Sequence, residues 1–380
     1  MSDEPSDAAP DLPEGAPTDR PLRRGWTTGT CAAGAAKAAF AGLVTGAFPD
    51  PVEVELPGGA RPAFALALHR RDADSATAGI VKDAGDDPDV THGALVKATV
   101  RRGAPGAGVT FRAGEGVGTV TRPGLPVVPG EPAINPVPRR MIEAGIREVA
   151  EAAGVPADVE VAVAIEGGAK LALKTLNPRL GIVGGLSVLG TTGIVVPYSC
   201  AAWIHSIHRG IDVARAMGLD HVAGATGNAS ETAVQKLHGL SEVALIDMGD
   251  FVGGMLKYLR VHPVAKVTVA GGVAKMTKLA QGLLDLHSKR GSADLPALAA
   301  LAAGAGAPVA LAEKIGAAHM VAEAFQIAGA AGFPLGDCVA RAAWASAARA
   351  LDQVDVALEI VVFDRDGSLM GRAPFAPAKA

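Results

Sequence analysis

Three stretches of the sequence combine hydroxyl groups, glycines and charged side chains in patterns that could bind a small polar ligand. The first directly precedes an alanine-rich helical pattern and consists of Thr27, Thr28, Gly29 and Thr30. The unpaired N–H groups and the dipole at a helix start attract anions, so this stretch could hold a carboxylate or a phosphate. Threonines also cap helices, which is the alternative. Cys31 has no histidine near it in sequence and is expected to be a small buried residue.

The second stretch is the loop Lys82–His92, which contains four carboxylates and an imidazole. Carboxylates that repel one another can have raised pKa values, and hard cations prefer oxygen ligands of this kind. If the reaction needs proton transfer or charge stabilisation, the candidate catalytic residues are Asp83, His92 and, later in the chain, Asp250. The loop lacks the twelve-residue calcium pattern, and an acidic solvated turn is the alternative.

The third stretch, Glu131–Arg140, is stiffened by prolines and ends in Arg139 and Arg140 at an expected helix start. Guanidinium groups suit carboxylates, so a polycarboxylate substrate would fit here, with a surface ion pair as the alternative. A further turn offers close backbone approach and two hydroxyls, suited to a nucleotide or an amino-acid moiety, or else to a structural hairpin. It consists of Gly190, Thr191, Thr192 and Gly193.

A possible metal cluster on a helical pattern is less favoured. His205, His208 and Asp212 share one helical face, with Arg209 among them. Because no dedicated ligand motif accompanies them, we expect a polar or site-facing surface and no metal site in the protein.

The elements that position these stretches differ between the two halves of the chain. The N-terminal half has an α+β pattern, with helices expected at Cys31–Leu43 and, opened by Pro138, at Arg139–Ala153. Gly and Pro punctuate the strands expected there, which are Val52–Leu56, Ala63–His69, Leu95–Arg101, Gly108–Ala113, Val117–Thr121 and Val159–Glu166.

The C-terminal half repeats a strand, a glycine-containing turn and a helix three times, which predicts a parallel sheet. The strands are His221–Ala225, Val243–Asp247 and Lys266–Ala270, with helices beginning near Ser230, Phe251 and Val273. Ligands bind at the carboxyl ends of such strands, where the three turns lie. The candidate binding residues of these turns are Thr226, Gly227, Asn228, Gly271 and Gly272, and Asp250 lies at the tip of the middle strand. Asp250 could equally cap a helix. A last strand is expected at Val356–Asp364.

The predicted fold is therefore α/β with two domains, an α+β part at 21–196 and a Rossmann-like part at 197–380, after a disordered acidic tail at 1–20. The last strands, near 355–375, could pack back on the first domain. Hydrophobic residues make up 49% of the chain, enough for real cores.

Composition also excludes several kinds of partner. The net charge of -4 argues against nucleic acid. The three scattered cysteines and the lack of a signal peptide favour a reducing, cytoplasmic location. The uncharged run Leu295–Ala312 is interrupted by prolines and glycines, so we expect a helix, a loop and a helix instead of a membrane span. A homo-oligomer is left open.

Seven of these stretches, in order and over nearly the whole chain after the tail, resemble the CbiD family of cobalt-precorrin-5B C1-methyltransferases from anaerobic cobalamin biosynthesis. They are GWTTGTCAAGAAKAA from Gly25, VKDAGDDPDVTHGA from Val81, GEPAINPVPRRMI from Gly130, NPRLGIVGGLSVLGTTGIVVPYS from Asn177, TGNASE from Thr226, MGDFVGGMLKYLR from Met248 and GGVAKMTKLAQG from Gly271. Two positions depart from the family pattern, which usually has Gly at Ala274 and often a Thr-His pair at Leu286-His287.

The resemblance implies S-adenosylmethionine as methyl donor and a cobalt-containing precorrin as acceptor, with the cobalt arriving as part of the substrate. The product would be cobalt-precorrin-6A. The carboxylate-edged macrocycle suits Arg139, Arg140 and the helix start at Thr30, and the donor suits the glycine and threonine turns. The alternatives are a nicotinamide-dependent oxidoreductase, although no Gly-x-Gly-x-x-Gly fingerprint follows a strand, and a non-catalytic tetrapyrrole carrier.

Overall fold

The computed structural model describes residues 20–379, except for the side chain of Lys289. Contacts within the chain divide it into two compact units between Ser199 and Cys200, and each unit has its own large hydrophobic core. The domain boundary expected from the sequence falls a few residues earlier, after 196. The expected tail lies outside the described residues, apart from Arg20.

The first unit is built on a five-stranded sheet of order β4-β5-β6-β9-β7, in which β7 runs parallel to β9 and the other pairs are antiparallel. Alternate residues of β6 and β9 are buried, as expected for a sheet with one face on the core. The elements are β1 (Gly25–Trp26), α1 (Thr28–Thr45), β2 (Val52–Glu53), β3 (Ala63–Phe64), β4 (Leu68–Arg71), β5 (Ser75–Val81), β6 (Leu95–Arg102), β7 (Val109–Ala113), β8 (Thr119–Val120), α2 (Pro136–Ala153), β9 (Val159–Ile165), α3 (Gly168–Ala172), β10 (Ile182–Val183) and β11 (Ile194–Val195).

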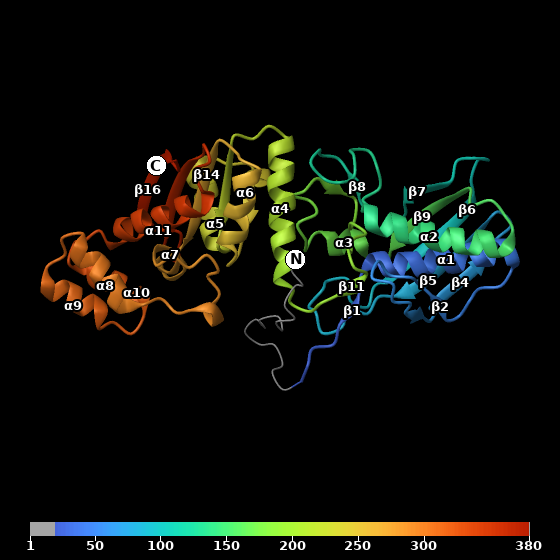
Figure 1. The fold of residues 1–380 in the computed structure, drawn as a ribbon, viewed down its shortest axis with the longest axis horizontal. Coiled ribbons are helices and arrows are strands. Elements are labelled where there is room, and N and C mark those ends of the chain that lie inside the picture. The colour runs from blue at the N-terminus through green and yellow to red at the C-terminus, as the bar shows by residue number, and fades with distance from the viewer. Residues whose placement is uncertain (1–19, 380) are drawn as a thin grey trace, which may run out of the picture. The chain divides into compact units, whose positions relative to one another are not determined.

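Helix α1 lies at the centre of this core, beside α2 and against β5 and β6 (Figure 1). Its alanines and glycines allow these neighbours to approach its backbone closely. A Cβ at Gly34, for example, would lie 2.7 Å from Cδ1 of Ile80. The helix ends at Gly46, which adopts the left-handed conformation with φ of 83°. The small residues thus place the start of α1 firmly within the unit.

The structure corrects several of the expected boundaries in this unit. Helix α1 begins at Thr28 and not at Cys31, and α2 begins at Pro136 and not after Pro138. The strand expected at Ala63–His69 is two short strands, β3 and β4. Strand β5, which was not predicted, occupies an inner position of the main sheet.

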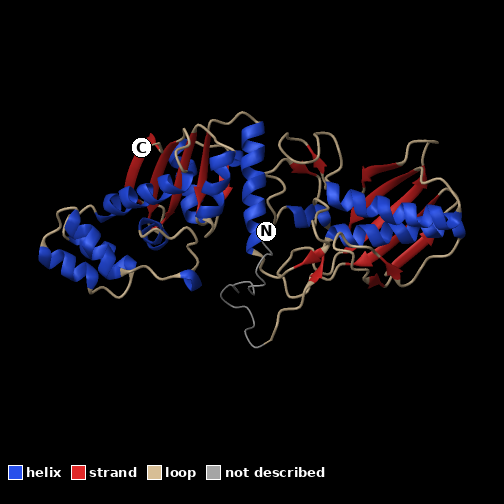
Figure 2. Cartoon of the chain, viewed as in Figure 1, coloured by secondary structure: helices blue, strands red, loops and turns tan. Residues whose placement is uncertain are grey.

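The second unit contains a sheet of order β13-β12-β14-β15-β16, whose first four strands are parallel and whose last is antiparallel (Figures 1 and 2). The elements are α4 (Cys200–Ala216), β12 (His221–Ala225), α5 (Asn228–His238), η1 (Glu242–Ala244), β13 (Leu245–Asp247), α6 (Val252–Val261), β14 (Lys266–Gly272), α7 (Val273–Ala280), η2 (Ser288–Arg290), α8 (Leu295–Gly304), α9 (Val309–Gly316), α10 (Val321–Ala330), α11 (Leu335–Leu351), β15 (Ala357–Phe363) and β16 (Leu369–Pro377).

The two faces of this sheet are covered unequally. The larger core joins one face to α4, α6, α7 and the helices from α8 to α11, and a smaller cluster joins the other face to α5. Neighbouring residues of a strand contribute to opposite faces, as with Val222 in the larger core and Ala223 in the smaller one.

The predicted parallel sheet and the helix-loop-helix at Leu295–Ala312 are both present. The last strands belong to the sheet of the second unit, because β15 pairs with β14 and β16 pairs with β15. No helix in the described part of the chain is long and apolar enough to cross a membrane.

Candidate functional sites

The hydroxyl groups at the start of α1 are engaged by the chain itself. The Oγ1 of Thr27 caps the helix by accepting a hydrogen bond from the Thr30 N–H at 3.2 Å. Thr30 Oγ1 in turn donates to the Gly193 carbonyl at 2.7 Å. Thr28 Oγ1 donates to the Leu189 carbonyl at 3.3 Å and accepts from the Leu189 N–H at 3.2 Å. The capping alternative therefore accounts for these contacts, and a ligand role for the three threonines stays a prediction.

The glycine-threonine turn at 190–193 packs directly on this helix start. The N–H of Gly29 donates to the Leu189 carbonyl, and that of Thr27 to the Gly193 carbonyl. Gly190 and Gly193 have φ values of 132° and 84°, and a Cβ at Gly190 would collide with Thr27. The structure thus brings together two stretches that are about 160 residues apart, as the 161-residue separation of the Thr28 and Leu189 bond shows. Of the turn, Thr191 and Thr192 remain exposed to a ligand.

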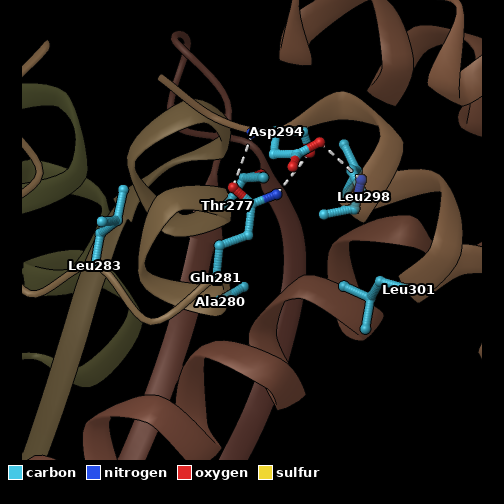
Figure 3. Close-up of a pocket in the computed structure, with 8 residues that line it drawn as sticks. Thr277, Ala280, Gln281, Leu283, Asp294, Leu298 and Leu301 are labelled. Carbon is cyan, nitrogen blue, oxygen red and sulfur yellow. Dashed lines mark hydrogen bonds between the residues drawn. The ribbon is translucent and has the colours of Figure 1, made fainter. Parts of the chain in front are cut away.

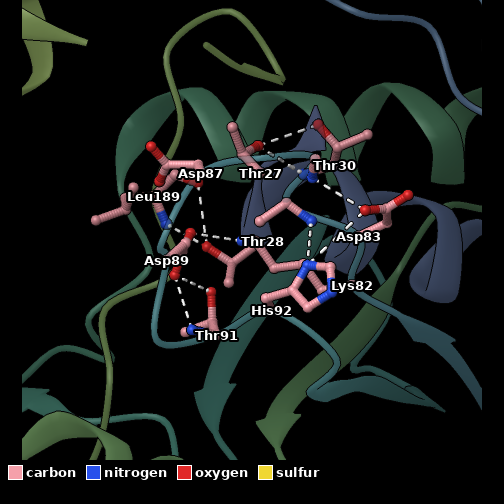
Figure 4. Close-up of polar contacts among 12 residues, drawn as sticks. Thr27, Thr28, Thr30, Lys82, Asp83, Asp87, Asp89, Thr91, His92 and Leu189 are labelled. Carbon is pink, nitrogen blue, oxygen red and sulfur yellow. Dashed lines mark hydrogen bonds and ion pairs between the residues drawn. The ribbon is translucent and has the colours of Figure 1, made fainter. Parts of the chain in front are cut away.

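The acidic loop lies beside the same helix start (Figure 4), and Asp83 and Asp89 of the loop form ion pairs within the unit. Arg23 forms a two-pronged ion pair with Asp83 and holds the pKa of that carboxyl at about 2. The Asp83 backbone carbonyl accepts from the Trp26 N–H at 2.7 Å, which fastens the loop to the strand before α1. His92 Nδ1 accepts from the Ala84 N–H at 3.1 Å, so Nε2 is the ring nitrogen left for other partners.

A buried lysine below this loop was missed as a functional candidate. The Lys82 side chain is 2% exposed, and its Nζ lies 2.6 Å from Asp89 Oδ2. Burial alone would raise the pKa of Asp89, but Lys82 and the hydrogen bonds from Thr91 keep it below its usual value. Burial raises the pKa of Asp87, whose Oδ1 accepts from the Tyr198 N–H at 2.8 Å. The position of Lys82 directly after the apolar residues Ile80 and Val81 was the available signal.

The two arginines of the third stretch differ in the structure. Arg139 donates through Nε to the Ile134 carbonyl at 2.8 Å, pairs with Glu131 and stacks over the Phe111 ring. These contacts agree with the ion-pair alternative, and they fasten the proline-rich segment to α2. Arg140 is exposed and has no side-chain partner within residues 20–379. It is therefore the better placed of the two to meet a carboxylate ligand.

In the second unit, two of the glycine turns meet at the switch point of the sheet, where the order of the strands reverses. Strand β12 has β13 on one side and β14 on the other, so the connection from β12 runs to one side and the next connection, from β13, crosses back to the other. Ligands bind at such a switch point in open parallel sheets. The Thr226 N–H donates to the Ala270 carbonyl at 3.0 Å, and a Cβ at Gly271 would lie 2.8 Å from Thr226 Oγ1. The predicted turns after β12 and β14 are thus in direct contact.

The turn after β13 is linked to this point through Lys275 on α7. Lys275 Nζ donates to the Thr226 carbonyl at 2.7 Å and lies 3.0 Å from Asp250 Oδ1. That oxygen is buried and receives no hydrogen bond from the described residues, so the ion pair is its polar contact. Asp250 therefore does not cap a helix with a side-chain bond; Phe251 is at the cap of α6. Lys275 is a second residue that sequence reasoning missed.

The histidine face on α4 serves local packing. The His208 ring stacks on Tyr258 at 3.9 Å between centroids, and the Tyr258 hydroxyl donates to Asp212 at 2.7 Å. Arg209 pairs with Asp212 at 2.7 Å, and burial lowers the pKa of His205 and of His208. No group of three or more metal-ligating side chains occurs among the residues that the structure describes.

A pocket of about 480 Å³ lies between α7 and α8, away from every predicted site residue (Figure 3). Its wall is mostly apolar and includes Leu283, Leu298 and Leu301. Gln281 closes one side by exchanging two hydrogen bonds with the backbone of Asp294, at 2.7 and 2.9 Å. Because these polar groups satisfy each other, the pocket offers few groups to orient a ligand.

The open, mostly parallel sheet with glycine turns at its switch point gives the second unit the architecture of the α/β domains, a class that commonly binds small ligands at that edge. Beyond this class, the chain belongs to the CbiD family. The family model named CbiD matches residues 16–197, and the model of the CbiD C-terminal domain matches 285–374. The family and the mixed α/β fold predicted from the sequence are confirmed.

Similar proteins from several bacteria carry one name, cobalt-precorrin-5B C(1)-methyltransferase. The chain is 67% identical to that of Agrobacterium fabrum over 94% of both chains. It is 66% identical to that of a Bradyrhizobium species, over 94% of this chain and 95% of the relative, and 63% identical to that of Halorhodospira halophila, over 95% and 98%. A crystal structure of cobalamin biosynthesis protein (cbiD) from Archaeoglobus fulgidus is 26% identical and covers 72% of this chain and 84% of that one, with a TM-score of 0.40.

Proposed function

We propose that this chain methylates C1 of cobalt-precorrin-5B to give cobalt-precorrin-6A, with S-adenosylmethionine as the methyl donor. The observation that carries the proposal is the 67% identity, over 94% of the chain, to a relative named for this activity. The lack of a dinucleotide fingerprint in a strand-to-helix setting disfavours a nicotinamide-dependent enzyme. A cytoplasmic location is part of the proposal, because the substrate and the donor are metabolites of that compartment.

We assign the donor to the switch point of the second unit. Helices α5 and α7 both begin there, after Gly227 and Gly272, and neither has a side-chain cap. Free N–H groups at helix starts attract an anionic group such as the donor's carboxylate. Lys275, which contacts Thr226 and Asp250, places a positive and a negative side chain beside these helix starts.

We assign the macrocycle to the first unit, at the start of α1. The groups left available there are Thr191, the Nε2 of His92 and, on α2, Arg140, whereas the exposed Thr192 hydroxyl is bonded to the backbone of Ile194. Leu189 adds an apolar contact, since its backbone is held by Thr28 while its side chain is 50% exposed. The pairing of Asp83 with Arg23 and of Asp89 with Lys82 limits the repulsion that a carboxylate-edged substrate would meet.

The chemistry asks the protein mainly to position two reactants. The methyl group sits on a sulfonium, so a neutral thioether leaves as the new carbon–carbon bond forms, and the acceptor carbon belongs to an electron-rich ring. Holding the two in line can provide effective molarities of about 10⁵–10⁸ M. Asp83, with its pKa held at about 2, is a weak base that can stabilise positive charge. His92, whose Nδ1 accepts from the Ala84 N–H, carries its proton on Nε2 when neutral and can donate a hydrogen bond to the substrate there.

The test is methyl transfer under anaerobic conditions from isotopically labelled S-adenosylmethionine to cobalt-precorrin-5B. Label in a product one methyl group heavier, together with S-adenosylhomocysteine, is the expected result. Binding of the macrocycle without transfer would identify a carrier instead. Calorimetric binding of NADH with no binding of S-adenosylhomocysteine would identify an oxidoreductase, and either outcome refutes the proposal.

A further inference from the structure

Two glycines at the carboxyl edge of the second sheet have no structural reason to be glycine. Gly227 is extended, with φ of 161° and ψ of 169°, and Gly272 has φ of -72° and ψ of 157°. Any residue can adopt either conformation. A Cβ built at either position meets no atom within 4 Å. Both residues occupy helix caps, where serine, threonine, aspartate or asparagine would bond the first turn.

The neighbouring glycines are different, because packing requires them. A Cβ at Gly271 would lie 2.7 Å from the Met276 sulfur and 2.8 Å from Thr226 Oγ1. A Cβ at Gly224 would collide with Met255. Gly227 and Gly272 are therefore the two that border open space, and this space lies at the starts of α5 and α7. Leaving it open favours the binding of a ligand close to both helix starts.

Two side chains at this edge, on α7 and in the turn after β13, carry opposite charges and are in contact. Lys275 Nζ lies 3.0 Å from Asp250 Oδ1, and the two side chains are 38% and 23% exposed. Lys275 also donates to the Thr226 carbonyl. Asp250 Oδ1 is buried beside Lys275 and accepts no hydrogen bond from the described residues, but the Asp250 side chain as a whole is partly exposed, so its carboxylate can accept from an ammonium group.

We propose that Lys275 and Asp250 bind the α-amino-acid end of the methyl donor, in the space bordered by Gly227 and Gly272; this rests on the function proposed above. The donor's carboxylate contacts Lys275 Nζ and the free N–H groups at the start of α7. Its ammonium contacts the Asp250 carboxylate and the Thr226 carbonyl. A zwitterion inserted in this way gives each charge of the pair a new opposite partner, so no charge is left without one. Asp250 thereby becomes a donor-binding residue and not a catalytic one.

Comparing two ligands distinguishes binding at this site from binding elsewhere on the donor-binding surface. S-adenosylhomocysteine carries the amino-acid end, and 5′-methylthioadenosine lacks it. Calorimetry with the full-length protein compares Lys275→Met with the matched control Lys266→Met. Lys266 forms an exposed ion pair with Asp220 at 3.6 Å, at the opposite end of β14.

Lys275→Met is expected to weaken S-adenosylhomocysteine about tenfold or more, as the loss of a charge-assisted contact does, and to leave 5′-methylthioadenosine unchanged. Asp250→Asn should behave in the same way, and Lys266→Met should bind both ligands as the unaltered protein does. Two results would overturn the amino-acid site. Lys275→Met could bind S-adenosylhomocysteine as tightly as the unaltered protein does, or it could lose affinity for both ligands to the same extent.

A Gly272→Ser variant excludes general damage to the fold. It is expected to unfold at the same urea concentration as the unaltered protein or a higher one, since serine caps helices well, while it weakens S-adenosylhomocysteine. Unchanged affinity in this variant would contradict the assignment of the space. If the unaltered protein bound no S-adenosylhomocysteine, the proposed function would itself fail. Binding that is insensitive to Lys275, Asp250 and Gly272 would leave that function standing and refute this site alone.

Discussion

Replacing Glu359 by glutamine should destabilise the second unit by about 3 kcal/mol, the low end of the cost of breaking a buried ion pair. The Glu359 side chain on β15 is fully buried. Its Oε1 accepts from Arg372 Nε at 2.7 Å and lies 2.5 Å from Nη2, and its Oε2 accepts from His238 Nε2 at 2.6 Å and Thr268 Oγ1 at 2.8 Å. One carboxylate thus joins three strands and the end of α5.

This magnitude follows from the hydrogen-bonding groups that the substitution leaves without a partner. If the glutamine oxygen stayed on Arg372, the glutamine NH2 group would face two donors, His238 and Thr268. The bond to one of them must then be lost or rearranged. Arg372 would lose its ionic partner, but its side chain is 38% exposed and can be hydrated in part, which favours the low end of the range. For a unit of this size the melting temperature should fall by about 6–12 °C.

The assay is urea unfolding followed by circular dichroism, for Glu359→Gln, Arg372→Met and the double variant. Arg372→Met should cost at least as much, because it leaves a fully buried carboxylate without its cation. The double variant should be less destabilised than the sum of the two, by about 1 kcal/mol or more. A single-variant effect below about 0.5 kcal/mol, or strict additivity, would show that the network contributes no coupled stability and would refute this reasoning.

Three further predictions concern the first unit. The pKa of Asp83 is lowered to about 2 from 3.8, so the stabilisation by its ion pair is present above pH 3.8 and lost as the pH falls toward 2. The free energies of unfolding of the unaltered protein and Asp83→Asn, measured with urea, should differ by less than about 1 kcal/mol at neutral pH, because the pair is exposed, and should converge toward pH 2. Thr30→Val should cost about 0.5–1.5 kcal/mol by removing one of the two hydrogen bonds that the Gly193 carbonyl accepts, the other coming from the Thr27 N–H, while Thr30→Ser should stay near the unaltered protein in thermal unfolding. Arg139→Met should lower the free energy of unfolding by about 1–2 kcal/mol. Arg140→Ala should change it by less than about 0.5 kcal/mol and should raise the KM for the macrocycle. A larger loss of stability in Arg140→Ala than in Arg139→Met, with KM raised only in Arg139→Met, would contradict the assignment of Arg140.

Local signals in the sequence were sufficient for the alternating part of the second unit. Short apolar runs followed by glycine and a helical pattern identified β12, β13 and β14 within a few residues, because strand, turn and helix chemistry are all local there. Strand β5 was missed because its sequence, SATAGIV, is mostly small residues that suit its contact with α1 but lack a bulky apolar run. Strand β16, with Pro374 within it, is an antiparallel edge strand, and proline argues against a strand when only the sequence is seen.

The candidate sites were harder to predict, because their decisive contacts join distant residues. The motif around Lys82 was recognised for its carboxylates, yet the buried ammonium that neutralises Asp89 follows only from the fold. Likewise, nothing in the sequence near Glu359 indicates that a histidine 121 residues away contacts it. Threonines at the start of α1 looked available for a ligand, and the turn that occupies them lies about 160 residues further on.

The glycines of the second unit show what the structure adds to a motif. Gly227, Gly271 and Gly272 look equivalent in the sequence, but packing explains only Gly271. The space at the other two lies at helix starts, which carry partial positive charge and therefore disfavour the donor's sulfonium. The same charge favours the donor's carboxylate, which Lys275 attracts as well. In the proposed site the donor lies with its amino-acid end toward Gly272 and its methyl group directed away from the caps, and this orientation predicts that the acceptor carbon approaches from the side opposite the helix starts.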